Sequence, residues 1–100
     1  MKVIWTKEAL ERLSDIEEFI AQNNPQRAEK FINLLIEQGE SISQNPKIGR
    51  IVPEISNPNL RELITKKYRI VYRIKSNQIE ILTVFEGHRL LRIDEIEIDF

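Results

Sequence analysis

The stretch YRIVYRI, residues 68–74, is the part of the sequence that decides the fold. Bulky and basic side chains alternate along it with the period of a β-strand, whose successive side chains point to opposite faces of a sheet. One set comprises Tyr68, Ile70, Tyr72 and Ile74. The other comprises Arg69, Val71, Arg73 and Lys75. We therefore expect one face of this strand to be buried and the other to carry cations.

Two further β-rich runs flank this strand. Leu60–Thr65 precedes it across Lys66-Lys67, and Ile79–Glu86 follows it across Ser76-Asn77-Gln78. Short polar turns of this kind join antiparallel neighbours, so the three runs predict a meander with a middle strand over Tyr68–Lys75. A further short strand is expected over Met1–Trp5, at the N-terminus.

Helical periodicity fills the region between the first strand and the meander. After Thr6, a plausible N-cap, a helix is expected to run to Asn23. Its apolar stripe is Ala9, Leu13, Ile16 and Ile20, widened by Leu10 and Phe19. Asn24-Pro25 ends this helix and starts a second over Gln26–Gln44, because proline is tolerated at a first helical position. One face of the second helix carries Ala28, Phe31, Ile32, Leu35 and Ile42, and another carries Leu34 and Ile36.

Prolines and glycine keep the chain irregular between Asn45 and Leu60. Together these elements predict the α+β class, with an N-terminal strand and a helical hairpin packed on an antiparallel β-sheet. A length of 100 residues predicts a single domain over 1–100. The N-terminus contains no apolar run typical of a signal peptide or membrane span, so a cytoplasmic location without membrane contact is expected.

Charge is nearly balanced but unevenly distributed, with 15 Lys and Arg against 16 Asp and Glu. Such a balance argues against binding nucleic acid through bulk electrostatics. The region from Leu60 to Arg92 has eight basic residues and three acidic ones, an excess of five positive charges. The basic residues are Arg61, Lys66, Lys67, Arg69, Arg73, Lys75, Arg89 and Arg92. This half of the chain is therefore the candidate surface for an anionic partner.

Few residues offer catalytic or metal-binding chemistry. The chain has no cysteine and one histidine, His88, which excludes disulfides and thiolate sites and makes a metal site unexpected. Three glycines form no phosphate-binding loop, and no cofactor is expected. The arginines of the last strands are suited to phosphates, and Tyr68 and Tyr72 to base stacking. A core position is the more frequent role of such strand tyrosines.

In combination, four segments resemble the RelE/ParE superfamily of bacterial toxins over nearly the whole chain. They are EALERLSDIEEFIAQNNPQRAEKFI (8–32), SQNPKIGRIVPEI (43–55), YRIVYRI (68–74) and GHR (87–89). The resemblance implies an antiparallel sheet flanked by a helical hairpin, in agreement with the elements above. It also implies a toxin held inactive by a cognate antitoxin, whose disordered tail folds on binding. We expect that tail to be acidic and amphipathic.

Two activities occur in this superfamily. RelE-like toxins are ribosome-dependent mRNA endonucleases, and ParE-like toxins inhibit DNA gyrase by binding it. Arg69 and Arg89 match two arginines of the first branch, with His88 as a further catalytic candidate. The lysines of that branch have no counterpart in LRELIT (60–65), and the aromatic residue after Arg89 is absent. Glu86 stands where many members have histidine before the last glycine.

These differences favour the ParE-like branch, in which the protein binds DNA gyrase and is not an enzyme, with plasmid stabilisation as the associated role. The RelE-like endonuclease, with ribosome and mRNA as partners, is the alternative, as is a degenerate toxin acting only in antitoxin and operator complexes. Target contact is expected from Tyr68, Arg69, Arg73, Arg89 and Arg92, with Arg69 and Arg89 close together on the open side of the sheet. Antitoxin contact is expected from Phe31, Leu34, Leu35 and Ile36.

The C-terminal run Ile93–Phe100 alternates apolar and acidic side chains. That period predicts a last, acidic strand that extends the sheet and lies beside the basic strands.

Overall fold

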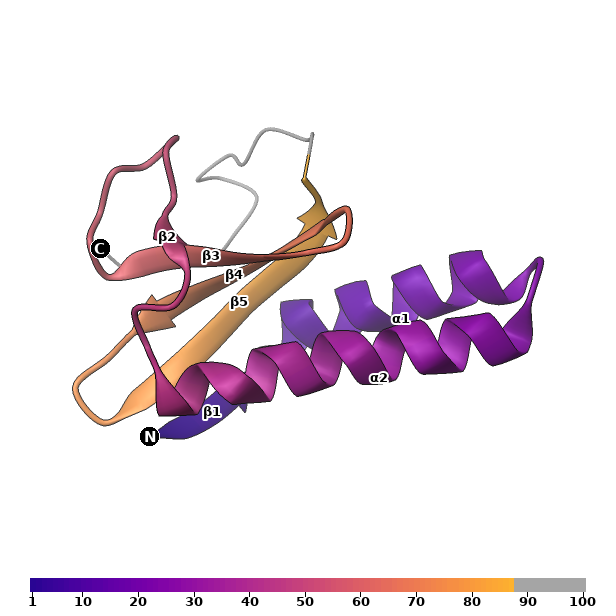
Figure 1. Ribbon diagram of the computed structural model, residues 1–100, viewed down its shortest axis with the longest axis horizontal. Coiled ribbons are helices and arrows are strands. Elements are labelled where there is room, and N and C mark those ends of the chain that lie inside the picture. The colour runs from indigo at the N-terminus through magenta and orange to yellow at the C-terminus, as the bar shows by residue number, and fades with distance from the viewer. Residues whose placement is uncertain (88–100) are drawn as a thin grey trace.

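Along the chain a strand is followed by a helical hairpin and then by four more strands (Figure 1). The computed structural model describes residues 1–87. The first three elements are β1 (Lys2–Trp5), α1 (Lys7–Ala21) and α2 (Pro25–Ser41), and a short 3₁₀ helix, η1 (Ile42–Gln44), follows. The remaining strands are β2 (Arg50–Ile51), β3 (Leu60–Thr65), β4 (Tyr68–Ile74) and β5 (Gln78–Glu86).

Local capping fixes the ends of both helices. The Thr6 hydroxyl accepts a hydrogen bond from the Ala9 amide, and the Asn24 side chain accepts one from the Arg27 amide, each at 3.1 Å. The second helix therefore begins at Pro25, as the N1 proline favours. The first ends at Ala21, two residues before the predicted Asn23. The predicted end of the second helix at Gln44 is that of η1, since the α-helix itself stops at Ser41.

The five strands form one sheet in the order β1-β5-β4-β3-β2. The predicted meander is confirmed, because β3 pairs antiparallel with β4 and β4 with β5. β1 pairs parallel with β5, from Lys2 opposite Gln78 to Trp5 opposite Ile81, so the sheet is mixed where we expected it to be antiparallel. β2 is a two-residue strand inside the segment predicted to be irregular. The predicted α+β class, with a helical hairpin packed on a sheet, is confirmed.

Buried apolar residues lie on both faces of the sheet. The larger cluster lies under the hairpin and includes Leu13 and Leu35 together with Ile70 and Tyr72 of β4. A smaller cluster on the opposite face consists of Val52, Leu60, Val71, Leu82 and Phe85. The alternation predicted for β4 is therefore confirmed. The expectation that its second face is a cation-bearing surface is wrong, because Val71 on that face is fully buried.

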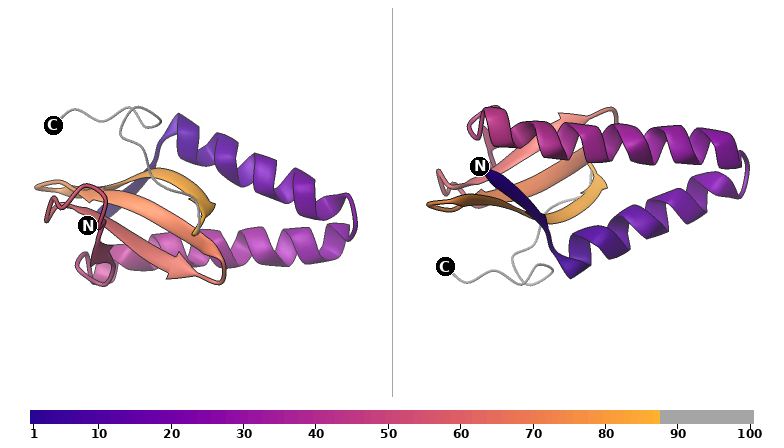
Figure 2. Two further views of the ribbon diagram at one scale, coloured as in Figure 1. Left: turned by 90° about the horizontal axis from the view of Figure 1, so that it is seen from above. Right: turned by 90° about the horizontal axis from the view of Figure 1, so that it is seen from below.

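The hairpin extends beyond the end of the sheet, with its tip far from the strands (Figure 2). Leu10 and Phe19 of α1 are 53% and 66% exposed, so the prediction that they widen the buried stripe is wrong. The sheet covers only a narrow stripe of α1 that includes Ala9 and Leu13. Neither helix has the length and apolar character needed to cross a bilayer within the part of the chain described.

Candidate functional site

Arg69, the candidate for target contact in the middle of the basic region, lies inside a cluster of carboxylates. Its side chain is 4% exposed. Nε donates a short hydrogen bond to Glu62, whose side chain is fully buried. The two terminal nitrogens donate to the two oxygens of Glu54, at 2.9 and 3.0 Å. The expected position of Arg69 on an open face is therefore wrong, because two carboxylates and the surrounding chain enclose its guanidinium.

The carboxylates of this cluster offset the cost of burying Arg69. Burial alone would lower the pKa of Arg69, but the hydrogen bonds and charges of Glu54 and Glu62 outweigh it and raise the pKa. Arg50 donates a second bond to Glu62 from Nε at 2.6 Å. The guanidinium of Arg69 also lies 5.0 Å from the centroid of the Phe85 ring, a cation–π distance. The cluster thus joins β2, β3, β4, β5 and the loop that carries Glu54.

Tyr72 fixes the segment before β2 from the other face of β4. Its hydroxyl donates to the Pro46 carbonyl at 2.7 Å and accepts from the Gly49 amide at 2.9 Å. Burial raises the pKa of Tyr72, against the smaller lowering effects of the Gly49 hydrogen bond and the Arg61 charge. Arg61 in turn donates to the Gly49 carbonyl at 2.9 Å. Tyr72 is therefore a core residue that positions the loop, the more frequent role noted for a strand tyrosine.

The other two candidates on β4 are partly exposed. Arg73 is 20% exposed in its side chain and pairs with Glu80 of β5 at 2.8 Å. Tyr68 packs its ring against Phe31 of α2, with the centroids 5.3 Å apart. Burial and the negative charge of Glu86 raise the pKa of Tyr68. Tyr68 therefore joins the helix layer to the end of the sheet and has only part of its ring available to a partner.

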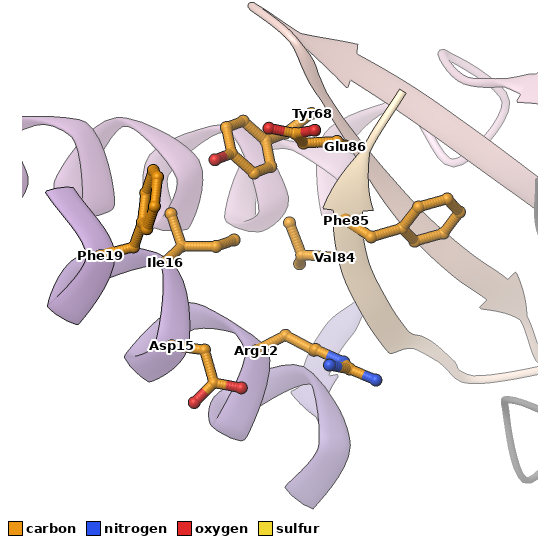
Figure 3. Close-up of a pocket in the computed structure, with 8 residues that line it drawn as sticks. All are labelled: Arg12, Asp15, Ile16, Phe19, Tyr68, Val84, Phe85 and Glu86. Atoms are coloured by element: carbon orange, nitrogen blue, oxygen red, sulfur yellow. The ribbon is translucent and has the colours of Figure 1, made fainter. Parts of the chain in front are cut away.

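A pocket of about 470 Å³ lies between α1 and the end of the sheet at Tyr68 (Figure 3). Its lining residues are Arg12, Asp15, Ile16 and Phe19 from α1 and Tyr68, Val84, Phe85 and Glu86 from β4 and β5. Sequence reasoning missed this pocket. The signal was the position of Phe19 at the margin of the helical stripe, which we interpreted as core.

The candidates for antitoxin contact differ in exposure. Leu35 is fully buried in the core under the hairpin and presents no surface. Phe31 is half-buried against Tyr68, Leu34 is half-buried, and Ile36 is 37% exposed. The structure therefore leaves Phe31, Leu34 and Ile36 partly accessible on α2.

The remaining predictions fall on residues outside 1–87. They concern His88, Arg89, Arg92 and the strand over Ile93–Phe100, including the proximity of Arg69 and Arg89. Among residues 1–87, no three His, Cys, Asp or Glu side chains gather in a group able to hold a metal ion.

Comparisons with known proteins agree with this arrangement. Residues 3–91 match the family described as "ParE toxin of type II toxin-antitoxin system, parDE". A relative named "Putative toxin Y4kP", from Sinorhizobium fredii, is 31% identical over 88 residues, which cover 88% of this chain and 90% of the relative. A relative named "Toxin RelE2", from Caulobacter vibrioides, is 29% identical over 90 residues, 89% of this chain and 98% of the relative.

A solved structure shares the fold. It is titled "Chromosomal ParDE TA system from P. aeruginosa" and aligns with a TM-score of 0.73 at 25% identity, covering 86% of this chain and 95% of that one. The family match spans both the helical hairpin and the meander, so it rests on the whole scaffold described above. The chain therefore belongs to the ParE toxin family of type II toxin–antitoxin systems, within the RelE/ParE superfamily.

Proposed function

We propose that this protein is a cytoplasmic toxin that inhibits DNA gyrase by direct binding and is neutralised by a cognate antitoxin. The observation that carries the proposal is the enclosure of Arg69. An RNA-cleaving toxin needs cations that hold the scissile phosphate as charge develops on it. Here the Arg69 guanidinium already binds Glu62 and both oxygens of Glu54. An incoming phosphate would have to displace a bidentate carboxylate from a side chain that is 4% exposed.

We infer a positioning role for Arg69 in target binding. Through Glu54 and Glu62 it holds the loop after β2 against the sheet, which shapes the surface around β4 and β5. Direct contact with gyrase is then proposed for Arg73, Tyr68, Arg89 and Arg92. Arg73 tests this division of roles, because its ion pair with Glu80 is partly exposed on both sides. Arg73→Ala should weaken gyrase inhibition while the protein stays folded.

The antitoxin is proposed to cover α2 through Phe31, Leu34 and Ile36. The burial of Leu35 removes that residue from the proposed contact set. Folding of the antitoxin tail on these side chains would bury apolar surface that the isolated toxin leaves in water. Mutual stabilisation between this chain and the product of its neighbouring reading frame is the expected observation.

The similarity to the protein named Toxin RelE2 supports a second candidate, a ribosome-dependent endonuclease. One experiment separates the two. Purified protein is added to a gyrase supercoiling reaction and, separately, to translating ribosomes with mRNA. The control for each reaction is the same protein preincubated with excess antitoxin. Inhibited supercoiling with intact mRNA supports the proposal, whereas mRNA cleavage with normal supercoiling overturns it.

A further inference from the structure

The segment Pro46–Ile51, which ends in β2, carries two exposed apolar side chains on a backbone that the core holds in place. Ile48 is 50% exposed and Ile51 is 39% exposed. The Tyr72 hydroxyl accepts from the Gly49 amide at 2.9 Å and donates to the carbonyl at the start of the segment at 2.7 Å. A backbone that is already fixed loses little conformational entropy when a partner binds it. The two isoleucines are therefore preorganised for a contact.

Arg50, between the two isoleucines, has a guanidinium that is oriented from one edge. Its Nε atom donates to the Glu62 carboxylate at 2.6 Å, while the Arg50 side chain as a whole is 63% exposed. Glu62 is fully buried in its side chain, so this bond holds the guanidinium against β3. Among residues 1–87, the two terminal nitrogens of Arg50 have no hydrogen-bond partner. Two parallel N–H donors of this kind can bind one carboxylate or phosphate through both of its oxygens.

The side chains beside Arg50 favour a protein over a nucleic acid as the partner. Nucleic-acid interfaces are polar and strongly basic, because most of their hydrogen bonds go to phosphates and sugars. Arginine beside apolar side chains is typical of protein–protein interfaces, where the apolar surroundings exclude water from the central contacts. The net charge of −1 for the whole chain points the same way. The segment therefore fits a carboxylate that is flanked by apolar side chains on a protein surface.

The register of the sheet places Arg50 on the face that carries Arg73, the residue proposed above for target contact. Arg50 is paired with Glu62 across β2 and β3, and Glu62 is paired with Val71 across β3 and β4. Paired residues share a face, as do residues two positions apart on one strand, which adds Arg73 to this set. Figure 1 shows β2 at the edge of the sheet, at the opposite end of the molecule from the tip of the hairpin. One partner can therefore contact Arg50 and Arg73 without covering the hairpin.

We infer that the segment Pro46–Ile51 is part of the gyrase-binding surface. The terminal nitrogens of Arg50 bind a carboxylate of gyrase, and Ile48 and Ile51 pack beside that ion pair. This inference rests on the proposed function, because it names further residues of the proposed target surface. Glu62 is a positioning residue in this arrangement, since it orients Arg50 from inside the fold and does not reach the partner.

Two matched pairs of variants test the inference. Ile51→Ala and Ile36→Ala each shorten an isoleucine of nearly equal exposure, 39% and 37%, on β2 and on α2. Arg50→Gln and Lys7→Gln each remove one positive charge from an exposed side chain, within the segment and on α1. Thermal melts establish that each variant is folded. The readouts are Kd for purified gyrase and Kd for the antitoxin from the neighbouring reading frame.

Ile51→Ala should raise Kd for gyrase about tenfold and leave Kd for the antitoxin within about twofold, because a few central contacts dominate interface energies. Ile36→Ala should leave Kd for gyrase within about twofold. Arg50→Gln should raise Kd for gyrase about tenfold at low salt and by less at high salt, whereas Lys7→Gln should have little effect at either.

Equal effects of Ile51→Ala and Ile36→Ala on gyrase binding, with tight wild-type binding, would overturn this inference alone. So would an unchanged Kd for gyrase in Arg50→Gln at low salt. Loss of antitoxin affinity in Ile51→Ala with unchanged gyrase binding would assign the segment to the antitoxin and would also overturn the inference. Absence of gyrase binding by the wild-type protein would overturn the proposed target and the inference together.

Discussion

The Arg69 cluster and the α1 pocket differ in how their charged side chains are placed. Those of the cluster are buried and paired, and those of α1 at the pocket form no ion pair among residues 1–87. In the cluster, Arg69 binds two carboxylates and lies over Phe85, with its side chain 4% exposed. In the pocket, Asp15 and Arg12 have no ion-pair partner among residues 1–87, and the adjacent Phe19 is 66% exposed. Arg69, which the sequence suggests as a contact residue, is bound to carboxylates inside the fold. The part of α1 that carries Phe19, which the sequence suggests as core, is exposed.

This contrast separates stability from binding. Breaking a buried ion pair leaves an uncompensated charge in a low-dielectric site, which costs several kcal/mol. Truncating an exposed aromatic side chain costs the isolated fold little and is felt only when a partner covers it. Substitutions in the cluster should therefore change the free energy of unfolding, and substitutions at the pocket should change it much less.

Arg69→Ala should have the largest effect on stability. It leaves the buried Glu62 carboxylate with its bond from Arg50 and removes the two bonds that Arg69 donates to Glu54. We expect the free energy of unfolding to fall by about 3–5 kcal/mol, measured by urea denaturation. Arg73→Ala is the control, because its ion pair with Glu80 is about one-fifth exposed on each side and should cost about 1 kcal/mol. Equal losses in the two variants would contradict a structural role specific to Arg69.

Gly49→Ala should have the next largest effect. A Cβ atom at this position would lie 2.6 Å from the Glu62 carbonyl oxygen and 2.7 Å from the Tyr72 hydroxyl. Relief requires the loop to move away from β3, so we expect a loss of about 1–3 kcal/mol. The melting temperature of the variant measures it. An unchanged melting temperature would show that the loop is not held closely against the sheet.

Tyr72→Phe should cost about 1–3 kcal/mol, because the Gly49 amide and the Pro46 carbonyl both lose their bond to the hydroxyl. A pH dependence accompanies this loss. Burial raises the pKa of Tyr72 in the folded protein above the value of about 10 expected in the unfolded chain. The stability that Tyr72 contributes is therefore fully present below pH 10. It is lost as the pH rises further, because Tyr72 deprotonates first in the unfolded state.

Comparison of the two proteins across that range isolates the tyrosine. Above pH 10, wild-type stability should fall more steeply than that of Tyr72→Phe, with Tyr68 contributing to the fall in both. Urea midpoints measured between pH 8 and about 11 check the prediction. Parallel curves for the two proteins would refute the assignment to Tyr72.

Phe19→Ala should have the smallest effect on stability, within about 0.5 kcal/mol, because the ring is already 66% exposed. Urea denaturation of the isolated protein measures this change, with Leu10→Ala as the matched control. A loss well above that of Leu10→Ala would mean that Phe19 supports the fold.

Local pattern was enough to predict the helical hairpin, the meander and the alternation of side chains along β4. Those features depend on periodicity and on signals such as Asn24-Pro25, which act within a few residues. The parallel pairing of β1 with β5 joins Lys2 to Gln78, and no local pattern reports a contact of that range. The sheet was therefore predicted as antiparallel and is mixed.

The candidate site was less predictable because it depends on long-range partners. Strand parity places Arg69 on the face opposite the hairpin, but Glu54 reaches it from a loop 15 residues away in sequence. A cation at that parity is equally compatible with an open surface. Phe19 was placed in the core because its helical position is close to the apolar stripe. It is 66% exposed because the sheet covers only a narrow stripe of α1, and the width of that stripe is not encoded in the helical period.

The most direct test of the central claim is the topology of a reporter plasmid in cells that express this protein. A toxin that binds gyrase, with Arg69 serving the fold and not cleaving RNA, predicts progressive loss of negative supercoiling as growth stops, and its reversal when the antitoxin is induced. The topoisomer distribution on a chloroquine gel gives the answer. Normal supercoiling in growth-arrested cells, accompanied by cleavage of translated mRNA, would contradict the account.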